Sequence, residues 1–268
     1  MPFLRECETE QMNSEAPGLF KYLAPSEEKL FFFEKSMVMV TPPLYLNDPW
    51  DFLPRKPKFT KQEMERLKAN NPGLTNSELL AKYPPFFQRE ISKICGIVSL
   101  TEKPLCRLMW AHYAESHAGF VAEFDAPDGG QNYGRMMRAS AVGPAIQVGY
   151  SPQVEPYMWD ETDIFDACCT KHADWKYEQE WRVILPLDEL PRFPTITRCS
   201  WLSEQRICWS FEPSRLRRVI LGMRMKPVVM KRLLEMLRRN DFKDVKIQTT
   251  AVDPETGELI ALEANLNH

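Results

Sequence analysis

Short apolar runs recur along the chain, and most of them have the length and alternation of β-strands. Strands are expected at 19–23, 37–41, 96–100, 119–124, 146–150, 178–187, 206–211, 218–221, 245–249 and 258–262. Helical patterns are fewer and are expected at 26–35, where a Phe-rich run also suits a strand, and at 105–115, 161–173 and 226–239. Because strands outnumber helices and do not alternate regularly with them, we expect an α+β fold with a mixed or mainly antiparallel twisted sheet and flanking helices.

The segment 54–94 differs in character, because it is rich in lysine and interrupted by proline. Two Thr-x-x-Glu segments within it, Thr60–Glu63 and Thr75–Glu78, have the spacing of capping boxes, in which the threonine begins a helix. Both helices are short, so we interpret the segment as a helical insertion and not as an independent domain. Residues 1–18 are polar and are expected to form a flexible leader before a single domain at 19–268.

Composition and charge narrow the class of protein. The chain has 268 residues, of which 44% are apolar and 26% are charged, as in ordinary globular domains. Its 34 Lys and Arg against 37 Asp and Glu give a net charge of −3, which argues against general DNA binding. It has 22 Pro but 11 Gly, with neither a G-x-G-x-x-G segment nor a P-loop, so a glycine-loop nucleotide fold is excluded.

The start of the chain and its cysteines predict a cytoplasmic location. No basic and then apolar segment resembles a secretory signal, and no apolar run approaches the roughly 20 residues that span a bilayer. The seven cysteines are irregularly spaced, which is typical of reduced thiols. The four histidines do not stand at ligand spacing from cysteines, so no metal site is expected.

The block L-M-W-A-H-Y-A-E-S-H-A-G-F, at 108–120, is the first candidate site. On a helix, His112 and Tyr113 share one face, and an overlapping face carries Trp110, Tyr113 and His117. One interpretation is an aromatic core helix whose histidines are hydrogen-bonded at its edges. The other is a platform for a planar ligand, on which Trp110 and Tyr113 stack. A polar contact to that ligand would then come from His112 or His117.

The block W-K-Y-E-Q-E-W-R-V-I-L-P, at 175–186, is the second candidate site. In a strand, Glu178, Glu180 and Arg182 point to one face because the side-chain period is two. Two carboxylates and a guanidinium on an otherwise apolar strand are costly to bury. They form either a solvated or ion-paired face, or a catalytic carboxylate aligned by its neighbours in a cleft.

Other polar residues are weaker candidates. Asn47 and Asp48, in the block Y-L-N-D-P-W-D, are natural turn residues that either form a turn alone or line the mouth of a site. Lys21 and Tyr22 lie on the first expected strand, and Ser99 lies near the end of another. A basic run forms either a solvated face or a contact to phosphates of an RNA or nucleotide. Its members are Arg215, Arg217, Arg218, Arg224, Lys226, Lys231, Arg232, Arg238 and Arg239.

Several blocks, taken in their order along the chain, resemble the bacterial domain-of-unknown-function 2971 family. They are F-K-Y, N-D-P-W-D, S-L-T after a strand, L-M-W-A-H-Y-A-x-x-H-x-G-F and K-x-x-x-W-x-Y-E-x-E-W-R. The likeness runs from about residue 19 to residue 262 and includes V-I-L-G-M-R before the last helix. The family itself implies little about activity.

The segment Y-E-Q-E-W-R-V-I-L-P is also similar to the E-x-E strand of ADP-ribosyltransferases. That resemblance implies that Glu180 is the catalytic carboxylate and that Glu178 orients the acceptor nucleophile. Ser99 would stand at the family's central Ser/Thr motif, and Lys21 or Tyr22 would take the first-strand position, where the family has Arg or His. It further implies NAD as the substrate and makes an ADP-ribosyltransferase-like fold possible.

The leading prediction is therefore an NAD-consuming enzyme, either an ADP-ribosyltransferase or an NAD glycohydrolase, in which Glu180 stabilises the ribosyl cation. Trp110 and Tyr113 would form the aromatic wall of the site. Asn47 or His112 would bind the polar edges of the nucleotide. Whether the acceptor is a protein or an RNA is left open.

Two alternatives belong to other classes. The first is a non-catalytic module that binds a small ligand or a partner protein through the same aromatic cleft. The second is a metal-dependent nuclease built on Asp48, Glu178 and Glu180. In that class a lysine commonly stands two residues after the acid, whereas this chain has Arg182 there.

Overall fold

The computed structural model of the protein describes residues 18–49, 51, 60–125, 145–152, 169–187 and 196–264. At 80–87 and 240 it describes the backbone alone. The expected leader lies almost entirely outside the described residues, as does the start of the expected insertion.

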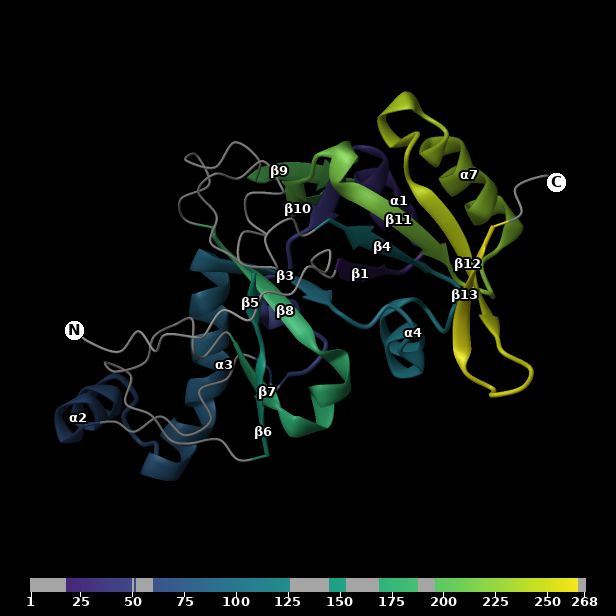
Figure 1. The fold of residues 1–268 in the computed structure, drawn as a ribbon. Helices are drawn as coiled ribbons and strands as arrows, with labels where there is room; N and C mark the ends of the chain where they lie inside the picture. Colours follow the sequence, from purple (N-terminus) through teal and green to yellow (C-terminus); the bar gives the residue numbers. More distant parts are fainter. Residues whose placement is uncertain are drawn as a thin grey trace, which may run out of the picture.

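A large mixed sheet runs through the middle of the molecule (Figure 1). Its strands, in spatial order, are β13 (Leu259–Glu263), β12 (Lys246–Val252), β11 (Leu216–Leu221), β4 (Phe120–Phe124), β1 (Leu19–Leu23), β3 (Cys95–Thr101), β8 (Glu180–Pro186) and β5 (Ile146–Gln147). Neighbours in this sheet are antiparallel except for β11 and β12, which the helix between them joins in parallel. The expected α+β fold with a mixed, mainly antiparallel sheet is therefore confirmed.

Helices pack on both faces of this sheet (Figure 1). They are α1 (Glu27–Glu34), α7 (Pro227–Leu237) and α4 (Arg107–Tyr113), with shorter 3-10 turns η1 (Pro43–Tyr45), η2 (Ala173–Glu178), η4 (Pro213–Arg215) and η5 (Asn240–Phe242). Leu19 and Leu23 of β1 belong to the same buried cluster as residues of α1 and α7. Phe20 and Tyr22, which alternate with them, belong to a second buried cluster with α4. One strand therefore serves both hydrophobic cores.

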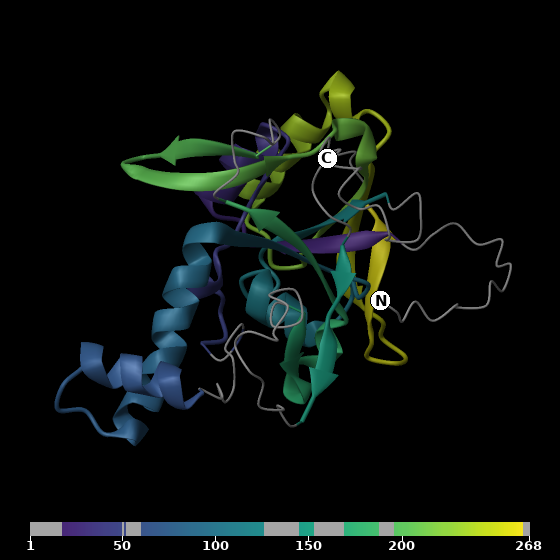
Figure 2. The same ribbon diagram turned by 90° about the vertical axis from the view of Figure 1, so that its left-hand side faces the viewer.

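Two smaller sheets flank the large one. One contains β2 (Met37–Met39), β10 (Glu204–Ser210) and β9 (Ile196–Trp201), and the other pairs β6 (Gly149–Ser151) with β7 (Thr170–His172) in parallel. The sequence pattern does not predict β9, because Ile196 is its only buried residue. The β9–β10 hairpin extends from the body of the molecule (Figure 2).

The chain between β5 and β8 differs from expectation. The strand expected at 146–150 is divided at Val148 between β5 and β6. Most of the helix expected at 161–173 lies outside the described residues, and its described end is the strand β7. Lys171 of β7 is buried against carboxylates, so a tertiary contact overrides the local helical pattern there.

The expected insertion contains two helices, α2 (Lys61–Asn70) and α3 (Asn76–Ile94), which project away from the large sheet (Figure 2). Both capping boxes form as predicted. The Thr60 N–H donates to the Glu63 carboxylate at 2.8 Å, and the Thr75 N–H donates to that of Glu78 at the same distance. α3 continues directly into β3, so this insertion is joined to an interior strand of the large sheet.

The strands β1 and β3 separate soon after they meet. Their backbones pair at one register position, Phe20 with Thr101, whereas β1 pairs with β4 along its whole length. Beyond that position the Lys21 ammonium donates to the Ser99 carbonyl oxygen at 3.1 Å. A lysine side chain therefore hydrogen-bonds to β3 where β1 and β3 are no longer paired through their backbones. The two strands are separated at this point of the sheet.

Candidate functional site

A small cavity of about 90 Å³ gathers the sequence blocks described above. F-K-Y of β1, the turn N-D-P-W-D, S-L-T of β3, α4 and the segment from β7 to β8 all contribute to its wall. Its wall residues are Phe20, Lys21, Tyr22, Leu46, Asn47, Asp51, Ser99, Leu100, Thr101, Met109, Tyr113, Lys171, Glu178 and Glu180. Segments far apart in the sequence thus converge on one concave point with several polar groups, which makes it the candidate site.

Arg182 is the centre of a buried ion cluster beside this cavity. Its side chain has no exposed surface, and its guanidinium donates two hydrogen bonds to each of two carboxylates. The distances are 2.9 and 3.0 Å to Glu180 and 3.0 and 2.6 Å to Asp51. Such bidentate contacts fix both carboxylates in position and in orientation.

Lys171 joins the cluster from β7. Its ammonium donates to Glu178 at 2.6 Å and to Glu180 at 3.2 Å, and it lies 3.6 Å from an Asp51 oxygen. The same ammonium lies 4.7 Å from the centre of the Trp175 ring, within cation–π range. Three carboxylates therefore share two buried cations.

The balance between burial and the attraction of the two cations differs for Glu178 and Glu180, so their pKa values shift in opposite directions. Burial by itself would raise the pKa of Glu180, but Arg182 and Lys171 outweigh burial and hold it well below its usual range. Burial raises the pKa of Glu178, with a further contribution from the Glu180 charge, against the opposing effect of Lys171. Glu180 is thus the ionised carboxylate at neutral pH, and Glu178 is the one that accepts a proton more readily.

Tyr113 and Asn47 connect the cluster to the surface. The Tyr113 hydroxyl donates to Glu178 at 2.5 Å, and the side-chain amide of Asn47, which is exposed, donates to the Tyr113 oxygen at 2.9 Å. Asn47 therefore lies at the mouth of the cavity and orients Tyr113, which in turn orients Glu178. These predicted site residues are brought together in space.

Glu178 reaches the site by a route that differs from the expected one. The strand begins at Glu180, not at 178, and Glu178 ends the 3-10 turn η2. Between them Gln179 has a left-handed backbone with φ of 45°, which reverses the chain and turns both glutamates toward Lys171. The predicted strand alternation is wrong for Glu178 and correct for Glu180 and Arg182. The Thr101 hydroxyl donates to the Glu178 carbonyl oxygen and anchors this turn.

Lys21, Ser99 and Glu180 come from three neighbouring strands, β1, β3 and β8, and all three line the cavity. Besides the contact of Lys21 to the Ser99 carbonyl, the Ser99 side chain hydrogen-bonds to Glu180. Burial, and then repulsion by Lys29, lowers the pKa of Lys21 to about 8, although Glu180 opposes this shift. Lys21 therefore titrates close to neutral pH at the opening between β1 and β3.

The interpretation of Trp110 as a ligand platform is wrong. Its side chain is completely buried, its indole N–H donates to the Pro104 carbonyl at 2.8 Å, and its ring stacks on His117 with centroids 5.9 Å apart. α4 ends at Tyr113, and Glu115–His117 have left-handed backbones, so His117 is turned back onto Trp110. The alternative interpretation of an aromatic core describes Trp110. It does not describe His117 fully, because the buried Nδ1 of His117 has no hydrogen-bond partner among the described residues.

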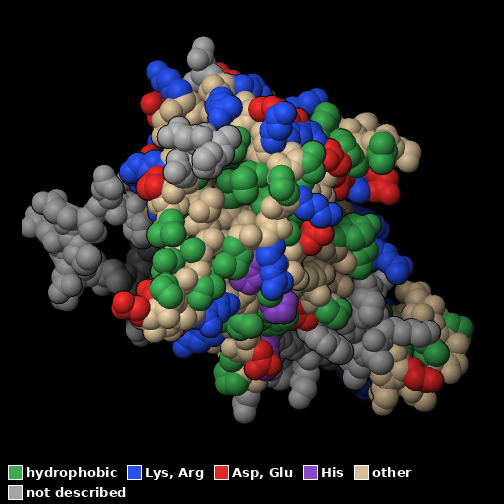
Figure 3. Space-filling model, turned by 90° about the vertical axis from the view of Figure 1, so that its right-hand side faces the viewer, with side chains coloured by type: hydrophobic (Ala, Val, Ile, Leu, Met, Phe, Trp, Pro, Cys, Tyr) green, Lys and Arg blue, Asp and Glu red, His purple; other side chains and the backbone are tan. Residues whose placement is uncertain are grey.

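His112 and Tyr22 lie at the edges of the site. His112 is exposed, and its ring contacts that of Trp175 at a centroid distance of 6.4 Å without reaching the cavity wall. On the face shown in Figure 3, histidine side chains lie at the molecular surface next to lysine and arginine. The Tyr22 ring packs in the second core and its hydroxyl donates to the Lys103 carbonyl at 2.7 Å, so one side of the ring forms cavity wall.

Sequence reasoning singled out Asp48 where the structure uses Asp51. Asp48 is buried but does not line the cavity, whereas Asp51, at the end of the same block, binds Arg182. Lys171 and Tyr150 were not predicted as site residues either. The Tyr150 hydroxyl accepts a hydrogen bond from the Glu180 N–H at 2.8 Å. Asp51 and Lys171 stand within the blocks N-D-P-W-D and K-x-x-x-W-x-Y-E-x-E-W-R, which is the one signal that could have found them.

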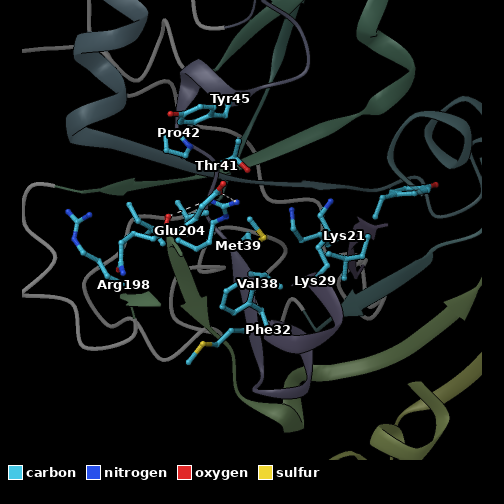
Figure 4. A pocket seen from close by; sticks show the side chains of 17 residues that line it. Lys21, Lys29, Phe32, Val38, Met39, Thr41, Pro42, Tyr45, Arg198 and Glu204 are labelled. Carbon is cyan, nitrogen blue, oxygen red and sulfur yellow. Dashed lines mark hydrogen bonds and ion pairs between the residues drawn. The ribbon is translucent and has the colours of Figure 1, made fainter. Parts of the chain in front are cut away.

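Figure 4 shows a larger cavity of about 640 Å³. It shares two wall residues, Lys21 and Tyr22, with the smaller cavity. It lies among β1, α1, β2 and the β9–β10 hairpin. Its further wall residues are Leu23, Lys29, Phe32, Met37, Val38, Met39, Val40, Thr41, Pro42, Tyr45, Arg198, Glu204, Gln205, Arg206 and Ile207.

Most of the basic run is paired with acidic side chains. Arg218 binds Glu123 at 2.7 Å, Arg232 binds Glu34 at 3.0 Å, and Arg239 binds Asp241. Arg215 and Arg217 both lie near Asp125. These pairs favour the interpretation of a solvated, ion-paired face over a phosphate contact.

Three general features concern the whole described chain. Its five described cysteines are free thiols, namely Cys95, Cys106, Cys169, Cys199 and Cys208. Among the residues with described positions, no group of three or more His, Cys, Asp and Glu side chains is arranged to hold a metal ion. None of the helices described here is both long and apolar enough to cross a membrane.

Comparison with known families finds a match over one segment, which supplies part of the candidate site. Residues 109–183 match the family described as "Protein of unknown function (DUF2971)", which confirms the family resemblance over this segment. The match includes Tyr113, Lys171, Glu178, Glu180 and Arg182. No curated protein and no solved structure matches the chain.

Proposed function

We propose that the protein is an NAD-consuming enzyme of the ADP-ribosyltransferase kind, with Glu180 as its catalytic carboxylate. The observation that carries the proposal is the meeting of Lys21, Ser99 and Glu180 at one cavity from three neighbouring strands. These are the first-strand, central and E-x-E positions that the resemblance to ADP-ribosyltransferases implied. Lys21 supplies a cation where that family has Arg or His.

The proposed reaction breaks the bond between nicotinamide and the ribose C1′ of NAD. The electron pair of that bond leaves with nicotinamide, which becomes neutral, and positive charge develops on the ribosyl group. An acceptor nucleophile, or water in the glycohydrolase reaction, then bonds to C1′ and loses a proton. Glu180 stabilises the ribosyl cation because Arg182 and Lys171 keep it ionised and fixed in place.

Glu178 has the properties of the group that receives the acceptor's proton. It lies beside Glu180 through their shared contact with Lys171, and burial raises its pKa toward the range that suits a general base. Tyr113, which Asn47 holds in place, donates to one of its oxygens, so the acceptor would enter from their side of the cavity.

The two cavities together offer the room that a dinucleotide needs. Pockets for organic ligands measure roughly 300–1,000 Å³. The 90 Å³ cavity at Glu180 is far below that range, whereas the adjoining 640 Å³ cavity lies within it. Because they share Lys21 and Tyr22, the reacting end of NAD would lie at Glu180 and the rest beyond Lys21.

Label transfer from NAD tests the proposal. The full chain is incubated with NAD labelled in its adenylate part and with a cell lysate, and both bound label and released nicotinamide are measured. Glu180→Gln should abolish both, while Glu90→Gln, an exposed change on α3, should leave both unchanged. Circular dichroism and melting curves establish that each variant is folded. Equal turnover by folded Glu180→Gln would rule out this role for Glu180.

A second candidate is favoured by a different observation, the burial of Glu180. Its side chain is 6% exposed, and Arg182 and Lys171 occupy both of its oxygens. Such a carboxylate also suits a non-catalytic module, in which the ion cluster shapes a binding site. In that case NAD or another small ligand would raise the melting temperature without any release of nicotinamide. No observation specifically favours the nuclease alternative.

A further inference from the structure

Two lysines of the larger cavity, Lys21 and Lys29, lie within ion-pair distance of no acidic side chain that the structure describes. The Lys21 ammonium donates to a backbone carbonyl, and the Lys29 ammonium makes no hydrogen bond or ion pair with any residue described in the structure. Glu28, the neighbour of Lys29 along α1, is bound instead by Arg206 at 2.6 Å. In Figure 4 the side chains of Lys21 and Lys29 lie side by side, at the opposite end of the cavity from Arg198.

The charges of Lys21 and Lys29 favour an anion bound between them. Burial, and then the charge of Lys29, lowers the pKa of Lys21, and burial lowers the pKa of Lys29 despite Glu28 and Glu115 nearby. For both ammonium groups, the cost of burial outweighs the attraction of the nearby carboxylates, and this weakens the folded state. An anion between them would remove both the repulsion and part of the desolvation cost.

The other wall residues of the cavity and its volume indicate the polarity and size of the rest of the ligand. Its floor is apolar, with Phe32 and Val38 buried and Met39 partly buried. Its far end carries Arg198, which is exposed, and the Arg206–Glu28 ion pair. A molecule that fits has a compact group of high negative charge at one end and an organic body of nucleoside size, given the volume of about 640 Å³.

We propose that this cavity binds a phosphate-bearing small molecule of the nucleotide class, with a phosphate held between the ammonium groups of Lys21 and Lys29. A phosphate fits better than a carboxylate, because it carries up to two charges and three acceptor oxygens to match two ammonium donors. The organic body then lies against the apolar floor beside Phe32. The inference deepens the proposed function, which places the rest of NAD in this cavity, but phosphate binding at Lys29 requires no turnover of NAD.

Isothermal titration calorimetry on the full chain tests this site with ADP, pyrophosphate and adenosine as probes. We expect ADP and pyrophosphate to bind and adenosine to bind at least ten-fold more weakly than ADP. Lys29→Met keeps the length of the side chain but removes its charge, so it should weaken ADP and pyrophosphate at least ten-fold. Lys29→Arg should retain binding, and Lys243→Met, an exposed lysine outside the cavity, should match the wild type.

Each other result overturns the inference. It is wrong if ADP does not bind to the wild-type chain, if adenosine binds as tightly as ADP, or if folded Lys29→Met binds ADP as tightly as the wild type. Weak binding by both Lys29→Met and Lys29→Arg would also contradict it, because charge would then not be the cause. Lys29-dependent ADP binding without NAD turnover would refute the proposed function alone, and NAD turnover with Lys29-independent ADP binding would refute this inference alone.

Discussion

Arg182 is the residue on which the geometry of the candidate site depends. Its guanidinium orients Glu180 on its own strand and Asp51 from a distant turn, and it is completely buried. The attraction within such a buried cluster only partly offsets the cost of removing its charges from water. The cluster is therefore better explained as a device that fixes the position of Glu180 than as a source of net stability.

Removal of the Arg182 charge should unfold the site. Arg182→Met leaves Asp51 and Glu180 buried with Lys171 as their one remaining cation, and we expect the free energy of unfolding to fall by about 3–5 kcal/mol. Urea unfolding measures this change. Lys93→Met, which breaks the exposed Lys93–Glu90 pair, is the matched control and should change the free energy by less than about 0.5 kcal/mol. An equal effect of the two substitutions would show that the cluster is not buried as described.

The depressed pKa of Glu180 also predicts how stability depends on pH. A carboxylate whose pKa is lower in the folded state than its usual 4.5 contributes stability that is fully present above that value. That contribution is lost as the pH falls below 4.5. The raised pKa of Glu178 acts mainly above 4.5, where protonation of Glu178 as the pH falls favours the folded state. Between pH 3 and 4.5, unfolding free energy should therefore fall less steeply in Glu180→Gln than in the wild type. Parallel pH profiles from urea unfolding would contradict the ion pairing of Glu180.

At the scale of elements, the end of α4 and the end of β1 are packed backbone against backbone. A Cβ at Gly119 would lie 2.2 Å from the Leu23 carbonyl oxygen, and one at Gly222 would lie 2.1 Å from that of His117. The three left-handed residues at Glu115–His117 turn the chain tightly enough to permit this approach. Gly119 therefore fixes the turn after α4 against β1, the strand that carries Lys21, and Gly222 fixes the same turn against the end of β11.

Substitution of Gly119 should separate these elements. We expect Gly119→Ala to lower the free energy of unfolding by at least about 1–3 kcal/mol, because its new methyl group meets backbone atoms that cannot move aside. Gly149→Ala is the control, because the nearest atom to its Cβ lies at an ordinary 3.7 Å. Melting temperatures compare the two. A melting temperature of Gly119→Ala equal to that of the wild type would refute the close approach.

Elements specified by local chemistry could be predicted from the sequence, whereas elements specified by distant contacts could not. The capping boxes Thr60–Glu63 and Thr75–Glu78 and the short apolar run of β1 act within a few residues. β7 forms where a helix was expected, because Lys171 is drawn to carboxylates on other segments. The turn at Gln179, which sets the place of Glu178, also depends on Thr101 across the sheet.

In the candidate site, too, residues placed by the local pattern could be predicted, whereas residues placed by distant contacts could not. Glu180 and Arg182 could be predicted as a pair because strand alternation alone places them on one face. Asp51 could not be paired with Arg182, because 131 residues separate them. Trp110 was open to two interpretations, since an aromatic residue on a helix suits either a core or a ligand wall and only its burial decides.

At the scale of the whole molecule, the opening between β1 and β3 determines where a ligand can lie. One cavity contains the carboxylates and the other contains the unpaired lysines, and Lys21 and Tyr22 belong to both. A chain with 22 Pro and 11 Gly offers no glycine cradle for phosphates. Lysine side chains and an apolar floor would hold a nucleotide in its place, with its reactive end at Glu180.

The rate of nicotinamide release from NAD, compared between the wild type and Glu180→Gln, tests the role of Glu180 most directly. Because the charge that stabilises the ribosyl cation is lost, we expect the wild type to release nicotinamide and the folded variant to be slower by at least about a hundred-fold. No release by the wild type, with or without lysate acceptors, or equal release by both proteins, would contradict an NAD-consuming site at Glu180.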